Sequence, residues 1–508
     1  MVADDQTSFI AGSGRPMNGH TDDPVAHLLM IHAADELRSY VGNLSAVVHA
    51  VERKWVPAND DPGVPEFLDT LRRYLTDTGL PEDNDFLLRY GLTVPGTQRG
   101  ITPPLMVLDE NRGGLSARRL REVEGQIRRL REALAIGRFL FPDLDGDTQQ
   151  ALLELTALYT RLPNAGDAEL LREFRHLSAA QAQQLAAEAF RCVGAGAEVL
   201  QDVGTNILQR LACFRNAALT EASCEALITK GIFWPSSLYR DAGDSVASRL
   251  TELIATGPDE LTLNHLLLAL AWTRSEVALE AFRSWSKHAP RWAESLCVPP
   301  AEFLLSAGWC LDEAGNRRDL ISLDCFRLSD PSGSATAEIT CRKTLRDECP
   351  SCGGPQGVLF ELGKTTENRF TGPLAEAPRR VLCCLHCSCY GVVFTRYHPD
   401  GTADWLSPVE PSEFAYGEGA GATLCCRTLE PSLMPPFACA KAFGLDDAST
   451  LGGIPMWLSD AEYPRCIDCG RLMTFLAQHD NHPLGEEGIY YAFFCAKCRV
   501  AGVTYQQT

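Results

Sequence analysis

The chain has 508 residues, of which 45% are hydrophobic and 22% charged. This composition is typical of globular protein, and the length predicts roughly two to four domains. The formal net charge is −20, from 66 acidic and 46 basic residues, and both the first 300 residues and the remainder are acidic. A protein that coats nucleic acid is therefore not expected, whereas an acidic surface suits solubility and a basic protein partner.

The chain shows neither a secretory signal nor a membrane span. Residues 1–5 lack a basic region followed by an apolar one. The most apolar stretch, residues 261–272, contains Asn264 and His265 and is too short to cross a bilayer. We therefore expect a cytoplasmic protein with no membrane contact, in which the 20 cysteines are buried thiols or metal ligands and do not form disulfides.

The N-terminal part of the chain is predicted to be disordered first and then helical. Residues 1–24 are rich in Gly, Pro, Asn and Asp and have few apolar side chains, which predicts disorder. Residues 25–176 are predicted to form a helical domain, clearest at 115–140, where leucines and other aliphatic residues recur at helical spacing. Its many arginines are interpreted as a solvated face that pairs with glutamates.

Residues 177–295 have the pattern of stacked helical hairpins. Short breaks separate six predicted helices, at residues 178–193, 196–214, 219–229, 243–256, 260–272 and 275–288. Helix pairs of this length are typical of HEAT-like repeats, which usually form docking surfaces.

The pattern changes after Pro299 and Pro300. Glycine and proline become frequent, and β-branched and aromatic residues alternate with polar ones, as in residues 392–397 and 490–494. We predict a boundary near 295–305 and a β-rich domain over residues 300–508. The fold class is therefore α+β, with a helical HEAT-like region followed by a β-rich domain.

Two sets of four cysteines have the spacing of metal ligands. Each set consists of two C-x2-C pairs, separated by spacers of 31 and 25 residues. Two such pairs supply the four thiolates that Zn²⁺ prefers, and a full shell indicates a structural site. The predicted ligands of two zinc ions are Cys349, Cys352, Cys384 and Cys387 in the first set, and Cys466, Cys469, Cys495 and Cys498 in the second.

The two sets resemble copies of one unit. A glycine follows the first pair of each set, at Gly353 and Gly470, and residues 387–394 align with residues 498–505 at a constant offset of 111. This duplication decides the register in the first set, because only Cys384 with Cys387 matches the second set. Cys383 and Cys389 are then extra thiols.

The remaining cysteines are interpreted as core thiols. Four precede residue 300 and fall singly, and six others lie outside the two sets in the C-terminal region. They are Cys192, Cys213, Cys224 and Cys297, then Cys310, Cys325, Cys341, Cys439, Cys425 and Cys426.

No enzyme signature is found. The chain has no G-x-S-x-G or H-E-x-x-H motif and no H-x-E motif of zinc deaminases. His386, His398, His479 and His482 lie near the cysteine sets and are interpreted as surface or hydrogen-bonded groups.

The C-terminal motifs resemble those of the YwqG-like family, a bacterial domain family of unknown function. The resemblance rests on residues 451–457, which read Leu-Gly-Gly-Ile-Pro-Met-Trp, on residues 463–478, whose apolar strand ends in Gln478, and on residues 488–494. It covers mainly residues 440–508. The resemblance implies a β-rich α+β domain without established catalysis, and some relatives are immunity proteins that block bacterial toxins.

These observations favour a non-catalytic, zinc-stabilised protein that binds another protein. The most specific hypothesis is an immunity protein that neutralises a secreted toxin, and the acidic charge suits a basic nuclease toxin. One alternative is a zinc-ribbon adaptor that contacts nucleic acid, although no basic stripe is seen near the ribbons. Another is an unrecognised hydrolase that uses the region of His479 and Asp480.

Overall fold

The computed structural model describes residues 23–34, 36, 136, 166–330, 339–363, 374–406, 427–440, 448–481 and 487–507. The chain divides into two compact units, Met1–Ile207 and Leu208–Thr508. The disorder predicted for residues 1–24 lies outside the described residues, apart from residues 23 and 24. The helix predicted at 115–140 also lies outside them, apart from Ile136, which is helical.

The first unit contains a helix over residues 24–34, α6 (Asp167–His176), α7 (Ala179–Gly194) and the larger part of α8 (Glu198–Phe214). Pro24 is the first helical residue, and the carboxylate of Asp23 accepts the Val25 N–H at 3.0 Å, as is usual at a helix start. The His32 and Phe174 rings are 5.6 Å apart, so this first helix packs on α6.

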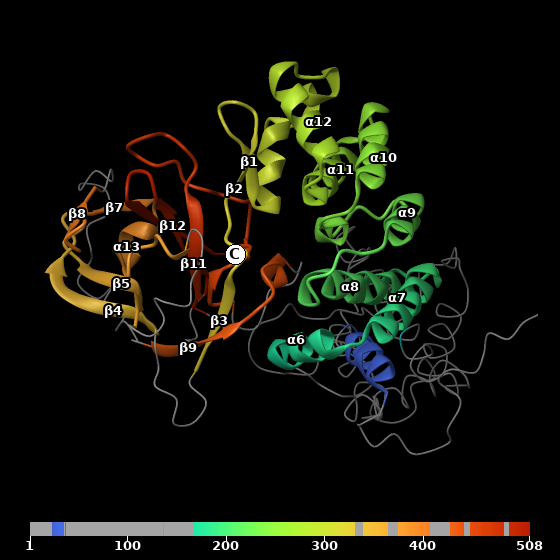
Figure 1. The fold of residues 1–508 in the computed structure, drawn as a ribbon, viewed down its shortest axis with the longest axis horizontal. Helices are drawn as coiled ribbons and strands as arrows, with labels where there is room; N and C mark the ends of the chain where they lie inside the picture. Colours follow the sequence, from blue (N-terminus) through green and yellow to red (C-terminus); the bar gives the residue numbers. More distant parts are fainter. Residues whose placement is uncertain are drawn as a thin grey trace, which may run out of the picture. The chain divides into compact units, whose positions relative to one another are not determined.

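The helices that begin the second unit lie close to their predicted positions (Figure 1). Thr220, Asp259 and Ser275 each accept a backbone N–H three residues ahead, and these caps fix the helix starts. The elements are α9 (Glu221–Thr229), η1 (Ser236–Tyr239), α10 (Asp244–Ala255), α11 (Glu260–Thr273), α12 (Glu276–Lys287), η2 (Arg291–Ser295) and η3 (Pro300–Ala307). No helix among the described residues is long and apolar enough to cross a membrane.

The C-terminal region is a large antiparallel sheet, as the strand pattern predicts. A separate hairpin precedes it, formed by β1 (Trp309–Leu311) and β2 (Arg317–Asp319). The sheet contains β3 (Cys325–Ser329), β4 (Ile339–Glu348), β5 (Pro355–Leu362), β6 (Arg380–Cys383), β7 (Val393–Tyr397), β8 (Ala403–Trp405), β9 (Arg427–Leu433), β10 (Thr450–Gly452), β11 (Thr474–Asp480), β12 (Ile489–Cys495) and β13 (Val500–Gln506). A short turn, η6 (Ala438–Ala440), follows β9, and α13 (Leu385–Ser388) connects β6 to β7.

The order of strands shows that the sheet is rolled. Among the described residues the order is β6-β5-β4-β9-β3-β10-β11-β12-β13-β7-β8, so β6 and β7 stand near opposite ends. One hydrophobic core nevertheless contains Val381 of β6 and Tyr397 of β7. The hydroxyl of Tyr397 also accepts the Leu382 N–H at 2.8 Å. The two ends of the strand order therefore meet at one core.

The G-G-x-P-x-W segment is fixed by its backbone and by Gln478. Gly452 and Gly453 have φ of +69° and +74°, and a Cβ on Gly452 would collide with the carbonyl oxygen of Asp324. The Gln478 amide accepts the Met456 N–H at 2.8 Å and donates to Ala448 O at 2.6 Å. These contacts give the motif a structural role in joining loops across the sheet.

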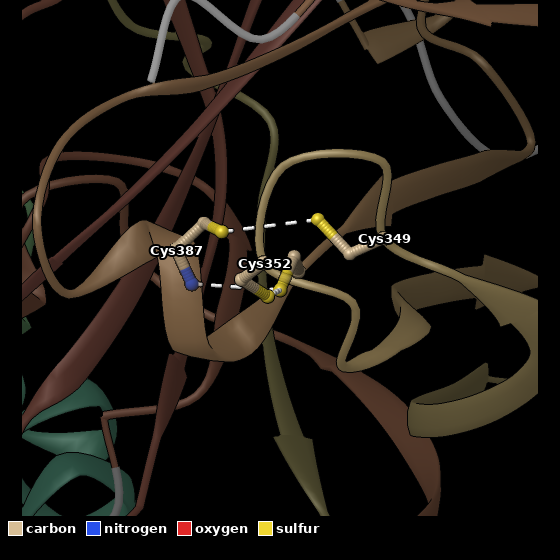
Figure 2. Close-up of side chains that lie close together, drawn as sticks. Cys349, Cys352 and Cys387 are labelled. Atoms are coloured by element: carbon tan, nitrogen blue, oxygen red, sulfur yellow. Dashed lines mark hydrogen bonds between the residues drawn. The ribbon is translucent and has the colours of Figure 1, made fainter. Parts of the chain in front are cut away.

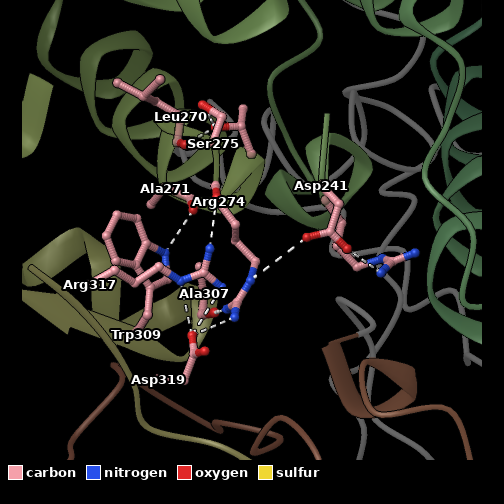
Figure 3. A network of polar contacts seen from close by, with 11 residues as sticks. Asp241, Leu270, Ala271, Arg274, Ser275, Ala307, Trp309, Arg317 and Asp319 are labelled. Carbon is pink, nitrogen blue, oxygen red and sulfur yellow. Dashed lines mark hydrogen bonds and ion pairs between the residues drawn. The ribbon is translucent and has the colours of Figure 1, made fainter. Parts of the chain in front are cut away.

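A buried arginine connects α11 to the β1–β2 hairpin (Figure 3). Arg274 ends α11 with φ of +52° and its side chain is only 4% exposed. It donates hydrogen bonds to Ala307 O and to the Asp319 carboxylate, the latter at 2.7 Å. The indole of Trp309 donates to Ala271 O at 3.0 Å and supports the same junction. Helices α9–α12 and the strands thus belong to one compact unit, and the domain limits near 176 and 295–305 stay predictions.

The Arg274 contacts predict a specific loss of stability. Replacing Arg274 with Leu leaves the buried Ala307 O without its donor and leaves Asp319 with Arg317 alone, and we expect the free energy of unfolding to fall by about 3 kcal/mol. Urea unfolding followed by tryptophan fluorescence measures this loss. Arg249→Leu is the control, because Arg249 forms an exposed pair with Glu252 and should change stability by less than about 1 kcal/mol. Equal effects of the two changes would contradict this role of Arg274.

Candidate metal centres

The first cysteine set meets at the tip of the β4–β5 hairpin. Cys349 follows β4, Cys352 precedes β5, and both face the helical turn α13, which carries Cys387 (Figure 2). Cys384 stands at the N-cap of that turn, where its sulfur accepts the Cys387 N–H at 3.5 Å. The local fold therefore directs all four sulfurs to one point.

The second set forms in the same way from the loop before β11 and the β12–β13 turn. Cys466 and Cys469 lie in the loop closed by the bridge between Arg465 and Leu472. Cys495 ends β12, and Cys498 lies in the turn before β13. The two sets come from separate segments of the sheet.

The first pair of each set forms the same backbone turn. The Cys349 N–H donates to Gly354 O at 2.6 Å, and the Cys466 N–H donates to Arg471 O at 2.8 Å. The glycine between them has positive φ in both turns, +73° at Gly353 and +68° at Gly470, which explains why glycine follows each first pair. The duplication inferred from the sequence is thus visible in the geometry of these turns.

The sulfur spacing fits a tetrahedral ion. In each set the four ligand atoms lie within 4.8 Å of one another. Measured pairs are Cys349–Cys387 at 3.8 Å, Cys352–Cys384 at 3.6 Å and Cys469–Cys495 at 3.7 Å. A tetrahedron with metal–sulfur bonds of about 2.3 Å has edges of about 3.8 Å. The measured pairs match these edges, and each set could therefore hold a metal ion.

Each set stabilises a thiolate. The Cys384 thiol donates a hydrogen bond that lowers the pKa of Cys349 to about 5, while the same contact raises the pKa of Cys384. Burial raises the pKa of Cys469, but the Arg471 backbone N–H and guanidinium donate to its sulfur and bring the pKa down to about 6. Thiolates are the form that binds metal, so both centres are prepared for a cation.

The two centres differ in burial and in what they connect. Val393 and Trp405 pack against Cys349, Cys384 and Cys387 of the first centre, whereas Cys469 and Cys498 of the second are both partly exposed. The first centre links β4–β5 to the β6–β7 connection, which join opposite ends of the strand order. Both centres link neighbouring strands, but the second lies in the turn between the paired strands β12 and β13, whereas the first lies where the chain leaves β6 for the distant strand β7.

Most of the other cysteines are where the sequence predicts. Those named as core thiols are buried wherever the structure describes them, except for Cys297. That prediction was wrong, because Cys297 lies in the exposed connection between η2 and η3 and not in a helix. Cys383 is buried, Cys389 is exposed, and Cys425 and Cys426 lie outside the described residues.

None of the described histidines belongs to either cysteine set. His398 Nε2 lies 2.7 Å from the Asp404 carboxylate, which is an exposed surface pair. His479 is fully buried, with Nδ1 3.3 Å from Ser449 Oγ. His482 lies outside the described residues. Sequence reasoning missed Arg471 as a thiolate partner, although it directly follows Gly470.

Comparison with known proteins finds a relative without a described activity. Over 316 residues the chain is 32% identical to the uncharacterized protein YpfL of Salmonella typhimurium, and the aligned region covers 61% of this chain and 73% of YpfL. No protein-family profile matches the chain. No solved structure matches it either.

Single substitutions separate metal ligands from spare thiols. We expect Cys352→Ser and Cys469→Ser each to lower the metal content by about one ion per chain, because a four-sulfur shell needs every thiolate. Cys352→Ser should destabilise more, by over about 4 kcal/mol, since its centre is more buried and packs against Val393 and Trp405. Elemental analysis and thermal unfolding measure both effects.

The matched control is Cys383→Ser, which removes a buried thiol next to Cys384 but outside the set. It should keep the full metal content. Loss of metal in this variant, with retention in Cys352→Ser, would show that the register of the first centre is wrong.

Proposed function

This chain belongs to the same family as the uncharacterized protein YpfL of Salmonella typhimurium, and we propose that it is a non-catalytic protein-binding protein held together by two zinc ions. The observation that carries the proposal is the pair of complete four-cysteine groups. Four thiolates fill the tetrahedral shell of zinc and leave no position for substrate or activated water. The resemblance to the YwqG-like family is part of the same proposal.

Zinc at these sites would supply a cross-link between segments of the sheet. The pairing of β5 with β6 already brings the hairpin close to Cys384. Zinc would in addition fix the hairpin loop at Cys349 and Cys352 to the helical turn at Cys387, because the contacts of a short loop rarely offset its conformational entropy. The backbone turns that carry the cysteines direct each sulfur toward the position of the ion.

The neighbourhood of His479 supports a structural reading over the hydrolase alternative. His479 and Ser449 are 0% exposed, and Asp480 is 4% exposed. The Asp480 carboxylate accepts the Ala448 N–H at 3.1 Å, and Ser449 Oγ accepts the Asp480 N–H at 3.1 Å. These groups connect β10 to β11, and a general base at His479 would need access to a substrate that such burial denies.

The partner we propose is a basic protein, and the most specific form is a secreted toxin domain neutralised by this chain as its immunity protein. The support is the net charge of −20, since opposite charge speeds association of two proteins. The helices α9–α12, proposed to be HEAT-like, would add a docking surface. This interaction would take place in the cytoplasm.

Affinity capture of the tagged protein from its native cells tests this proposal. We expect a basic partner to be retained in near-equal amount and to be released by high salt, because salt screens charge attraction between exposed groups. Mass spectrometry identifies the partner, and zinc analysis of the same sample confirms that the bait is intact. Zinc-replete protein that retains no partner at low salt would contradict a constitutive complex, and an acidic partner would contradict the charge argument.

A further inference from the structure

The second metal centre is surrounded by basic side chains, although the protein as a whole is acidic. We define the second knuckle surface as residues 465–471 and 495–499. It contains one acid, Asp468, and four bases, which are Arg465, Arg471, Lys497 and Arg499. Arg465, Lys497 and Arg499 are exposed. Asp468 is already paired with Arg396 of β7 at 2.6 Å, so the surface has a local excess of positive charge.

These bases have no acidic partner within the described part of the chain. Arg465 donates to Gly470 O at 3.2 Å, and Arg499 donates to Tyr397 O at 3.2 Å, so their hydrogen bonds go to backbone oxygens and not to carboxylates. Arg471 lies against the Cys469 sulfur. Part of the positive charge of these bases therefore balances the negative charge of the cysteine thiolates in the second centre.

The first centre shows whether basic residues are needed to balance the negative charge of the cysteine thiolates. Where the second knuckle surface has Arg465, Arg471, Lys497 and Arg499, the first copy has Glu348, Gly354, His386 and Ser388. The same four-sulfur geometry forms there without these bases. The basic residues are therefore not needed to build a four-cysteine centre, and another role has to account for three exposed cations.

An apolar side chain and a cavity accompany the charge. Ile467 stands at the tip of the turn and is 46% exposed. A cavity of about 290 Å³ reaches the base of the same loop, where it is lined by Arg465 and Leu472, together with Leu305 of η3 and Leu311 of β1. Its lining also contains the acids Glu302, Asp312 and Glu313 and the bases Arg283 and Lys287, so the cavity itself does not select anions. A preference for an acidic ligand therefore depends on the bases of the second knuckle surface.

We infer that the second knuckle surface binds an acidic, apolar-containing peptide segment of a partner protein. Carboxylates of the segment pair with Arg465, Lys497 and Arg499, and an aliphatic side chain contacts Ile467 and enters the adjoining cavity. A peptide is favoured over nucleic acid because the exposed contact residue is aliphatic and cannot stack on bases. This inference does not depend on the basic partner proposed above.

Fluorescence anisotropy with defined probes tests the inference on the full chain. The main probe is a fluorescein-labelled peptide in which pairs of Glu alternate with single Leu residues. The comparison probes replace Glu with Lys, replace Leu with Ser, or are an oligothymidylate of equal charge. We expect the Glu–Leu peptide to bind about tenfold more tightly than any of the others at low salt.

The test variant gives the second knuckle surface the residues of the first copy. Arg465→Glu/Lys497→His/Arg499→Ser should weaken Glu–Leu peptide binding by about tenfold or more and should retain two zinc ions per chain. Arg249→Glu/Arg172→Ser/Arg191→Ser makes the same change in charge at exposed helical sites and should leave binding unchanged. Ile467→Ser, which keeps every charge, should also weaken binding.

Three results would overturn the inference: no binding of the Glu–Leu peptide to the wild-type protein, equal loss in the helical control, or tighter binding of the oligothymidylate. The last result would assign the surface to nucleic acid. Zinc analysis of each variant distinguishes loss of the surface from loss of the fold.

Discussion

The contact on which the β region depends is the convergence of the β4–β5 hairpin and the β6–β7 connection at four cysteines. The pairing of β5 with β6 brings the hairpin beside Cys384, whereas β7 leaves to pair with β13 near the other end of the strand order. What lies between β6 and β7 is a side-chain hydrogen bond from Leu382 N–H to the Tyr397 hydroxyl, the shared core and the first four-cysteine centre. A rolled sheet with a long-range closure gains most from a cross-link at that place.

The second centre shows how a duplicated unit has acquired a different environment. In the second copy, β12 and β13 form a continuous hairpin around Cys495 and Cys498. In the first copy, β6 and β7 separate, and β7 instead pairs with β13. The third strands of the two copies therefore pair with each other, and Arg396 of β7 meets Asp468 of the second knuckle surface.

The features that could be predicted from the sequence are those set by residues close together in the chain, namely helix limits and cysteine turns. Helix limits were predicted to within about two or three residues, because caps such as Thr220 and Asp259 and short polar breaks mark the ends. The eight cysteines predicted as ligands gather into two groups, and the sequence pointed to them because C-x2-C spacing and the glycines Gly353 and Gly470 follow from turn geometry. The constant shift between the two copies also favoured Cys384 over Cys383 as a metal ligand, and the structure brings Cys384 into the first group.

Features that depend on strand order could not be read from the sequence. The bases of the second knuckle surface are spaced over two segments, so no basic stripe is visible until β11, β12 and β13 align. The buried environment of Arg274 requires Ala307 and Asp319, which are distant in the chain. The exposure of Cys297 was missed because an isolated cysteine beside a helical pattern has no local signal for burial.

The central claim is that both centres are closed, four-sulfur zinc sites. X-ray absorption at the zinc edge of the purified protein tests it most directly, since the scattering of sulfur differs from that of nitrogen and oxygen. The account predicts two zinc ions per chain and a first shell of sulfur alone at about 2.3 Å. A shell that includes nitrogen or oxygen at about 2.0 Å would indicate an open or mixed centre, and would contradict the non-catalytic role assigned to these cysteines.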